Sequence, residues 1–99
     1  MNTATVGIGS EIDAYIAKSG IPNSRWYVGI TSDIQERLFG YHNVPRKNAW
    51  WIHRPCTSAA EARELEAAYH RAGCQGAGGG GDADSVYIYA YVITPTTVE

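Results

Sequence analysis

The sequence predicts an α+β domain in which a small, mostly antiparallel sheet of three strands packs against about three helices. Strands are predicted for three segments with alternating or bulky apolar residues, namely 25–30, 49–54 and 86–93. Helices are predicted where apolar residues recur at helical spacing behind capping residues, namely 10–19, 32–41 and 58–72. With 99 residues, of which 44% are hydrophobic and 18% charged, the chain has the size and composition of one folded domain.

The first helix is expected over 10–19, because Ser10 can cap its start and Gly20 ends it. We expect this helix to cover the core. The first strand alternates strictly, and one of its faces consists of Trp26, Val28 and Ile30. Its other face carries Tyr27 and Gly29.

The second helix is expected directly after the first strand. Thr31, Ser32 and Asp33 form a cluster of capping residues, in which Ser32 makes a capping box with Gln35, and the helix should run to about Tyr41. Its apolar face is expected to consist of Ile34, Leu38 and Tyr41. The second strand carries Trp50 and Trp51, which face opposite ways, so we expect both faces of the sheet to be covered.

The third helix begins at another capping box, formed by Ser58 and Glu61, and ends at Gly73. Its apolar stripe consists of Ala62, Leu65, Tyr69 and Ala72. The glycine-rich stretch 76–84 interrupts regular structure and is either a flexible linker or a loop that allows close approach. The last strand alternates, and one of its faces consists of Tyr87, Tyr89, Tyr91 and Ile93.

The composition argues against several classes of protein. No apolar run approaches the roughly 20 residues that a membrane helix needs, and no secretory signal is recognisable, so we expect a cytoplasmic protein with no membrane partner. Cys56 and Cys74 have no CxxC spacing and are expected to be reduced thiols. The histidines lack the paired spacing of zinc ligands, so we expect no structural metal.

The charge is distributed unevenly. A net charge of −2 speaks weakly against a nucleic-acid partner. However, the window from Arg37 to Arg54, which includes Arg46 and Lys47, contains no acid, and all ten acids lie outside it. This window is either a solvated loop or a surface that binds phosphate groups.

Two charged residues stand at unusual positions. Arg37 lies three positions after Ile34 and four before Tyr41, hence on the apolar face of its predicted helix. A buried guanidinium needs a carboxylate, carbonyl groups or a ligand anion; otherwise its stem packs and its head stays in water. Glu66 lies at the margin of the third helix's apolar stripe, where its carboxylate could hold a divalent cation.

These residues resemble the second half of the GIY-YIG nuclease domain. The motif Tyr27-Val28-Gly29 corresponds to the YIG element, and Arg37 follows Tyr27 by ten positions. Tyr41, four positions further on, stands where the family has Tyr or His. The segment EARELEAAY at 61–69 is similar to the helix that carries the family's metal-binding glutamate, which matches Glu66. The resemblance spans residues 26–72.

The resemblance implies a single GIY-YIG-like domain over 1–99 that hydrolyses phosphodiester bonds, as a DNA endonuclease or nickase, with one divalent cation, Mg²⁺ or Mn²⁺. Arg37 would neutralise the scissile phosphate, Glu66 would hold the cation, and the tyrosines, Tyr27 and Tyr41 among them, would position or deprotonate the attacking water. Gly29 would let a phosphate or a tyrosine ring approach the strand. Further substrate contacts are predicted for His42, Arg46 and Lys47.

The family's first strand, with its GIY tyrosine, is missing from its usual place. The residues about ten positions before Tyr27 form a helix and a turn, and Gly20-Ile21-Pro22 lacks the tyrosine. In a permuted version of the fold, the C-terminal strand would occupy this place. The lost hydroxyl would then come from Tyr87, Tyr89 or Tyr91, and we include Tyr89 among the predicted catalytic residues. Alternatively, these tyrosines have only a structural role and cover one face of a half-buried sheet.

Several polar residues and the function itself leave alternatives open. Asp82 and Asp84 are either extra metal ligands or solvated turn residues. His42 and His53 are either candidate bases or structural residues. Besides a nuclease, the sequence allows a catalytically weak or inactive module that binds nucleic acid or another protein with the same face. It also allows an inhibitor of the phage or mobile-element type, whose acidic glycine-rich loop binds a host protein.

Overall fold

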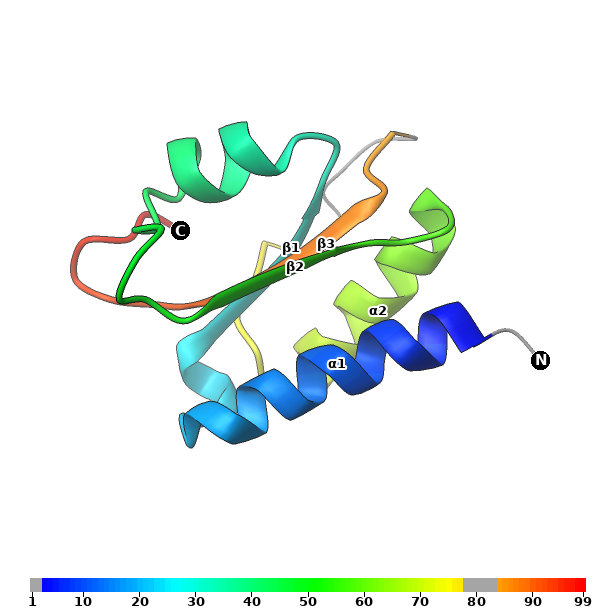
Figure 1. The fold of residues 1–99 in the computed structure, drawn as a ribbon, viewed down its shortest axis with the longest axis horizontal. Coiled ribbons are helices and arrows are strands. Elements are labelled where there is room, and N and C mark those ends of the chain that lie inside the picture. Colours follow the sequence, from blue (N-terminus) through cyan, green and yellow to red (C-terminus); the bar gives the residue numbers. More distant parts are fainter. Residues whose placement is uncertain (1–2, 78–83) are drawn as a thin grey trace.

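The structure, a computed structural model, describes residues 3–77 and 84–99. An antiparallel sheet of three strands lies between two helical layers (Figure 1). One layer consists of α1 (Thr3–Ser19) and α2 (Ala59–Arg71), and the other of η2 (Gln35–Tyr41). This arrangement confirms the predicted α+β class. None of the helices in the described part of the chain is long and apolar enough to cross a membrane.

The sheet consists of β1 (Trp26–Thr31), β2 (Trp51–Pro55) and β3 (Tyr87–Val92), in the order β1-β3-β2. β3 pairs antiparallel with both neighbours, so the last strand of the chain is the central one. The outer edge of β1 is also paired, because Gln75 donates to Trp26 O (2.7 Å) and accepts from Val28 N–H (2.9 Å).

The aliphatic face of the sheet forms the larger core, together with α1 and α2. Trp26 and Val28 from β1 pack there with Ile88 and Ala90 from β3. α1 begins at Thr3 rather than at Ser10, because Ile8 is buried in the same core and the packing extends the helix. Tyr69 ties the two helices together, since its hydroxyl donates to Gly9 O (3.1 Å) and to Asp13 (2.8 Å).

The predicted start of α2 is confirmed by its hydrogen bonds. The Ser58 hydroxyl accepts from the Glu61 N–H (3.1 Å), and the Glu61 carboxylate accepts from the Thr57 N–H (2.7 Å). Trp50, which directly precedes β2, packs in the α1/α2 core and Trp51 packs on the opposite face, so the two tryptophans face opposite ways as predicted.

The helix η2 differs from the predicted α-helix. It is a π-helix that ends with a hydrogen bond from His42 N–H to Arg37 O (2.9 Å), five residues apart. Its first turn is capped by Asp33, which accepts from the Glu36 N–H (3.1 Å), so the capping role predicted for Ser32 is wrong. The short 3₁₀ helix η1 (Asn23–Arg25) precedes β1.

Candidate functional site

The candidate site consists of residues on the aromatic face of the sheet, which η2 covers, and of Glu66 from α2 in the opposite helical layer. Cross-strand pairing places Tyr27 opposite Tyr91 and Gly29 opposite Tyr89. The ring of Tyr27 is stacked with those of both tyrosines, with centroid distances of 5.2 Å to Tyr91 and 6.4 Å to Tyr89. The C-terminal strand therefore brings tyrosine side chains next to the Tyr27-Val28-Gly29 motif.

Gly29 accommodates the ring of Tyr89. A Cβ atom at Gly29 would lie 2.5 Å from Tyr89 Oη and 2.7 Å from Cζ, closer than non-bonded atoms can approach. Of the two predicted reasons for a glycine here, a phosphate or a tyrosine ring, the structure shows the tyrosine ring.

His42 has no exposed surface, and both of its ring nitrogens have hydrogen-bond partners. Nδ1 lies 2.5 Å from Val98 O, and because a carbonyl oxygen can only accept, Nδ1 donates. In the neutral ring Nε2 is then an acceptor, and the Tyr89 hydroxyl donates to it at 2.7 Å. Burial lowers the pKa of His42, which favours this neutral ring. The substrate contact predicted for His42 is therefore wrong, because the residue is enclosed and positions Tyr89.

Tyr89 is only 2% exposed, so it has almost no surface for contact with a substrate and can only support its neighbours. Burial raises the pKa of its hydroxyl, which therefore keeps its proton at neutral pH. Tyr91, also buried, donates to Val98 O (3.3 Å) beside the same histidine. The two tyrosines and His42 form one hydrogen-bonded group beneath η2.

Arg37 and Tyr41 are both exposed, in contrast to the apolar face predicted for them. Ile34 and Leu38 are buried as predicted, but the third buried residue is His42 in place of Tyr41, so the buried positions are four apart. A π turn holds more residues than an α turn, so residues four apart lie more nearly in line. The Arg37 guanidinium lies 5.3 Å from the ring centroid of Tyr41, which is 55% exposed. Of the predicted alternatives for Arg37, the structure shows an exposed head.

Glu66 is buried, with 8% of its surface exposed, although it lies on a helix margin. It makes no hydrogen bond or salt bridge with any residue that the structure describes. Its two carboxylate oxygens keep some contact with solvent, because neither is among the fully buried atoms that lack a partner. Burial raises the pKa of Glu66, and the charges of His70 and Arg63 only partly oppose this effect.

Electrostatic interactions show which of these groups lie near one another. Burial is the main cause that raises the pKa of Tyr27, while Glu66 raises it further and Arg37 lowers it. The pKa of Tyr89 is raised chiefly by burial and is also affected by Arg37 and Glu66. Tyr41 raises the pKa of both Tyr27 and Tyr89. Glu66, Arg37 and Tyr41 are thus each within electrostatic reach of Tyr27 and Tyr89.

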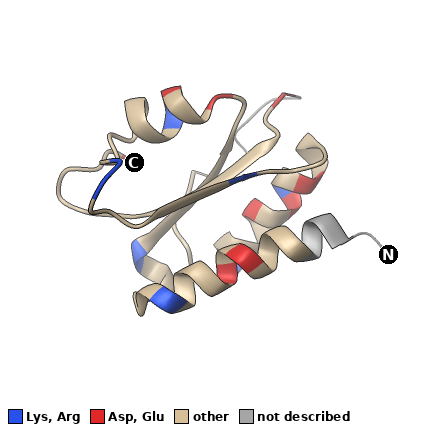
Figure 2. Cartoon of the chain, viewed as in Figure 1, with Lys and Arg blue, Asp and Glu red and all other residues tan. Residues whose placement is uncertain are grey.

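Arg46 and Lys47 lie in the exposed connection between η2 and β2. The Arg46 guanidinium lies 3.9 Å from the ring centroid of Phe39 and donates to the Gln35 side chain. Figure 2 shows that this connection is basic, whereas acidic residues lie at the start of η2 and along α1 and α2, in the layer beyond the sheet. Arg54, at the end of the basic window, faces that acidic layer and pairs with Glu11 (2.5 Å).

The fit of a divalent cation depends on Glu66. Asp82 lies outside the described residues, and Asp84 is exposed ahead of β3. Within the described ranges, no group of three or more His, Cys, Asp or Glu side chains could hold a metal ion. Mg²⁺ sites often use one or two carboxylates, with water and substrate phosphate completing the shell, and the uncompensated carboxylate of Glu66 fits this pattern.

Two further residues near the site could not be found from the sequence. His70 Nε2 donates to Val28 O (2.9 Å), which attaches α2 to the edge of β1 one turn after Glu66. A Cβ atom at Gly76 would lie 2.7 Å from the same carbonyl oxygen and would overlap the His70 ring. The special role of Gly76 is hidden in the sequence because it begins a run of glycines.

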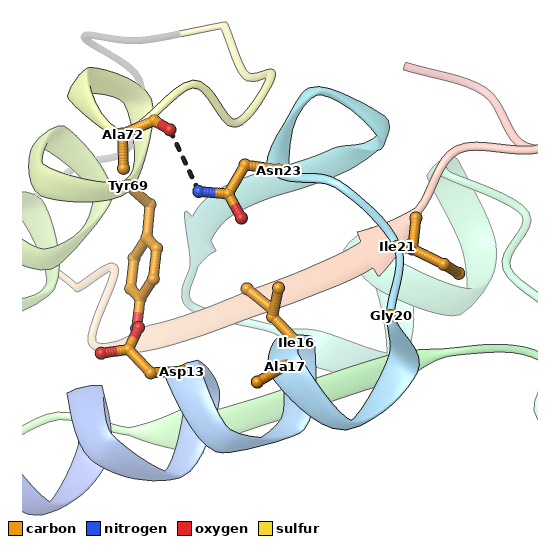
Figure 3. Close-up of a pocket in the computed structure, with 8 residues that line it drawn as sticks. All are labelled: Asp13, Ile16, Ala17, Gly20, Ile21, Asn23, Tyr69 and Ala72. Carbon is orange, nitrogen blue, oxygen red and sulfur yellow. Dashed lines mark hydrogen bonds between the residues drawn. The ribbon is translucent and has the colours of Figure 1, made fainter.

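A cavity of about 310 Å³ lies on the other side of the molecule, between α1, η1 and α2 (Figure 3). Its polar groups are already hydrogen-bonded to the protein, because Tyr69 donates to Asp13 and Asn23 donates to Ala72 O (3.0 Å). We therefore regard this cavity as a packing gap between helices, and we place the candidate site at Glu66 and Tyr27.

Comparisons with protein-family models, with curated proteins and with solved structures found no match for this chain.

Proposed function

We propose that this protein is a metal-dependent phosphodiesterase of the GIY-YIG type, acting as a DNA endonuclease or nickase. The observation that supports this most is the buried carboxylate of Glu66, which lacks a partner in the described part of the chain and raises the pKa of Tyr27. A carboxylate in this situation lowers stability, and such groups cluster at functional sites. A ligand cation would offset that cost.

Each side chain has a role that its surroundings support. The exposed guanidinium of Arg37 can reach and neutralise a phosphate, and Tyr41 holds it by a cation–π contact. Glu66 would hold the divalent cation, which, when bound, would stabilise charge on the phosphate and lower the pKa of water. The Tyr27 hydroxyl would orient the attacking water by a hydrogen bond. Burial raises the pKa of Tyr27, and a backbone hydrogen bond from Ala77 and the charge of Arg37 oppose this only in part, so the hydroxyl keeps its proton and has a positioning role.

The hydrogen-bonded group behind the site would keep these residues in place. Tyr89 fills the space over Gly29 and donates to His42, so both are positioning residues in this proposal. The carbonyl of Val98 fixes the tautomer of His42.

Nicking of supercoiled plasmid with Mg²⁺ or Mn²⁺ tests the proposal. We expect Glu66→Gln and Arg37→Gln to lower the rate by about 10²-fold or more, the effect of removing one charged or hydrogen-bonding group from a transition state. Glu64→Gln, an exposed carboxylate on the same helix, and Arg71→Gln, an exposed arginine at its end, should retain the wild-type rate. No nicking by the wild type, or equal nicking by all variants, would refute the proposal.

The near-complete burial of Tyr89 favours a second candidate function. Tyr89 is the hydroxyl predicted to replace that of the missing GIY tyrosine, and in this structure it is turned toward His42 rather than toward solvent. The protein would then be an inactive module that uses the same face to bind nucleic acid or a host protein. DNA binding in EDTA, without cleavage in any divalent metal, would support nucleic-acid binding. A host protein that binds the wild type through Arg37 would instead support host-protein binding.

A further inference from the structure

A row of three rings lies on the aromatic face, at the side of the sheet formed by β2. We call this group the edge row; it consists of Phe39, Trp51 and His53. Phe39 meets Trp51 edge to face, with centroids 5.0 Å apart. Trp51 and His53 lie parallel, with an angle of 2° between their planes and centroids 5.8 Å apart. All three side chains are partly exposed, so part of each ring is accessible to solvent.

The edge row lies beside the candidate site. In the strand register, Trp51 is opposite Tyr91 and His53 is opposite Tyr89. Neighbouring strands lie about 4.8 Å apart, so one strand spacing separates the edge row from the tyrosines of the site. β2 is an edge strand, and no described strand lies beyond it in the sheet order.

Positive charge accompanies the edge row. The Arg46 guanidinium lies over Phe39, and the Trp51 indole N–H donates to Arg46 O (3.2 Å). Among the described residues the only salt bridge joins Arg54 and Glu11, so neither Arg46 nor Lys47 has a carboxylate partner there. Acidic residues of α1 and α2 lie in the layer on the opposite side of the sheet (Figure 2).

We propose that the edge row is a stacking platform for unpaired bases of DNA, with the strand's phosphates contacting Arg46 and Lys47 and leading toward Arg37. The proposal rests on the proposed function for the choice of DNA as substrate. Exposed aromatic rings next to unpaired cations match a single strand, whose bases offer free π faces. In a duplex these faces are stacked on neighbouring base pairs, so only the charges could be used. The preferred substrate would then be unpaired or branched DNA.

Fluorescence anisotropy with a labelled oligothymidylate tests this proposal, with a duplex of the same length for comparison. EDTA in the buffer prevents cleavage, so binding is measured separately from catalysis. We expect tighter binding of the single strand, and a loss of roughly 5- to 150-fold in affinity for Trp51→Leu, the range for stacking on one ring. Trp51→Phe should stay close to the wild type, because it retains a ring.

Trp50→Leu is the matched control, because Trp50 neighbours Trp51 but packs in the core on the other face. It should bind the oligonucleotide as the wild type does. Arg46→Gln changes only an exposed residue and should lower affinity and reduce the slope of log Kd against log salt by about 1. This second variant keeps the proposal testable if Trp51→Leu fails to fold.

Equal affinity for duplex and single strand, or equal losses for Trp51→Leu and Trp50→Leu, would overturn the proposal. Tighter binding of oligouridylate than of oligothymidylate would overturn the choice of DNA. The outcome can be separated from the nicking test: a protein that binds single strands through Trp51 but never nicks supports the platform and refutes the nuclease. A protein that nicks plasmid, but whose affinity for single strands is unchanged by Trp51→Leu, supports the nuclease and refutes the platform.

Discussion

Replacing Gly29 with alanine should destabilise the protein through a single clash. The new Cβ would lie 2.5 Å from Tyr89 Oη, 2.7 Å from Cζ and 3.2 Å from Cε2. Tyr89 cannot turn away easily, since it is 2% exposed and its hydroxyl donates to His42. Overpacking of this kind typically costs about 1–3 kcal/mol, so we expect the free energy of unfolding to fall by that amount.

Urea unfolding of four proteins, in a double-mutant cycle with Tyr89→Leu, measures this cost. A leucine side chain ends before the ring atoms that clash, so Gly29→Ala should cost less than about 0.5 kcal/mol in that background. It could even stabilise the strand, because glycine weakens a strand interior. Gly7→Ala is the control, since nothing lies within 4 Å of its Cβ position in α1 and alanine is the better helix former. Equal losses from Gly29→Ala in both backgrounds would refute the reasoning.

Three further predictions concern residues around the same site. Glu66→Gln should raise the free energy of unfolding at neutral pH, because burial raises the folded-state pKa above 4.5 and folding therefore disfavours the carboxylate. In urea titrations at several pH values, this gain should appear as the pH rises above 4.5 and vanish below it. At His42 the pKa shift has the opposite sign, because its folded-state pKa lies below 6.5. The unfolded chain therefore binds the proton first, and the free energy of unfolding of the wild type should fall as the pH drops below 6.5. His42→Phe should show a shallower fall, and His53, whose pKa is also lowered, should account for part of what remains. Gly76→Ala should destabilise by about 1–3 kcal/mol, because its Cβ would meet Val28 O, and faster hydrogen exchange of the Val28 amide would report the loss of edge pairing. An unchanged unfolding midpoint for this variant would contradict the close approach of Gly76 to Val28.

The parts of the fold that were predicted from sequence depend on local interactions. The alternation in β1 and β3 sorts residues onto two faces whatever the strand order, and the capping box at Ser58 uses residues within one turn. The sheet order could not be predicted, because it depends on pairing between residues far apart in the chain. The start of α1 was missed for a similar reason, since burial of Ile8 decides it.

The arrangement of the side chains at the candidate site depends on interactions that the sequence does not reveal. An α-helical period places Tyr41 on the buried face, but the π turn exposes Tyr41 and buries His42. What favours His42 inside is its contact with Val98, 56 residues later, together with Tyr89. No local pattern contains that information. The marginal position of Glu66 was visible from helical spacing, but its lack of a partner among the described residues was not.

The two sides of the site differ in a way that bears on its function. Between η2 and the sheet, the polar atoms of Tyr89, Tyr91 and His42 are hydrogen-bonded to one another or to Val98. These hydrogen bonds stabilise and orient the three side chains. On α2, in the opposite layer, the carboxylate of Glu66 has no hydrogen-bond partner among the described residues. A protein selected for stability alone would gain from glutamine at this position, whereas one that binds a cation there would lose its activity. Measuring both properties on the same Glu66→Gln protein therefore separates a working site from an inactive one: stabilisation with lost nicking indicates catalysis, and stabilisation with unchanged DNA binding and no nicking in either protein indicates a binding module.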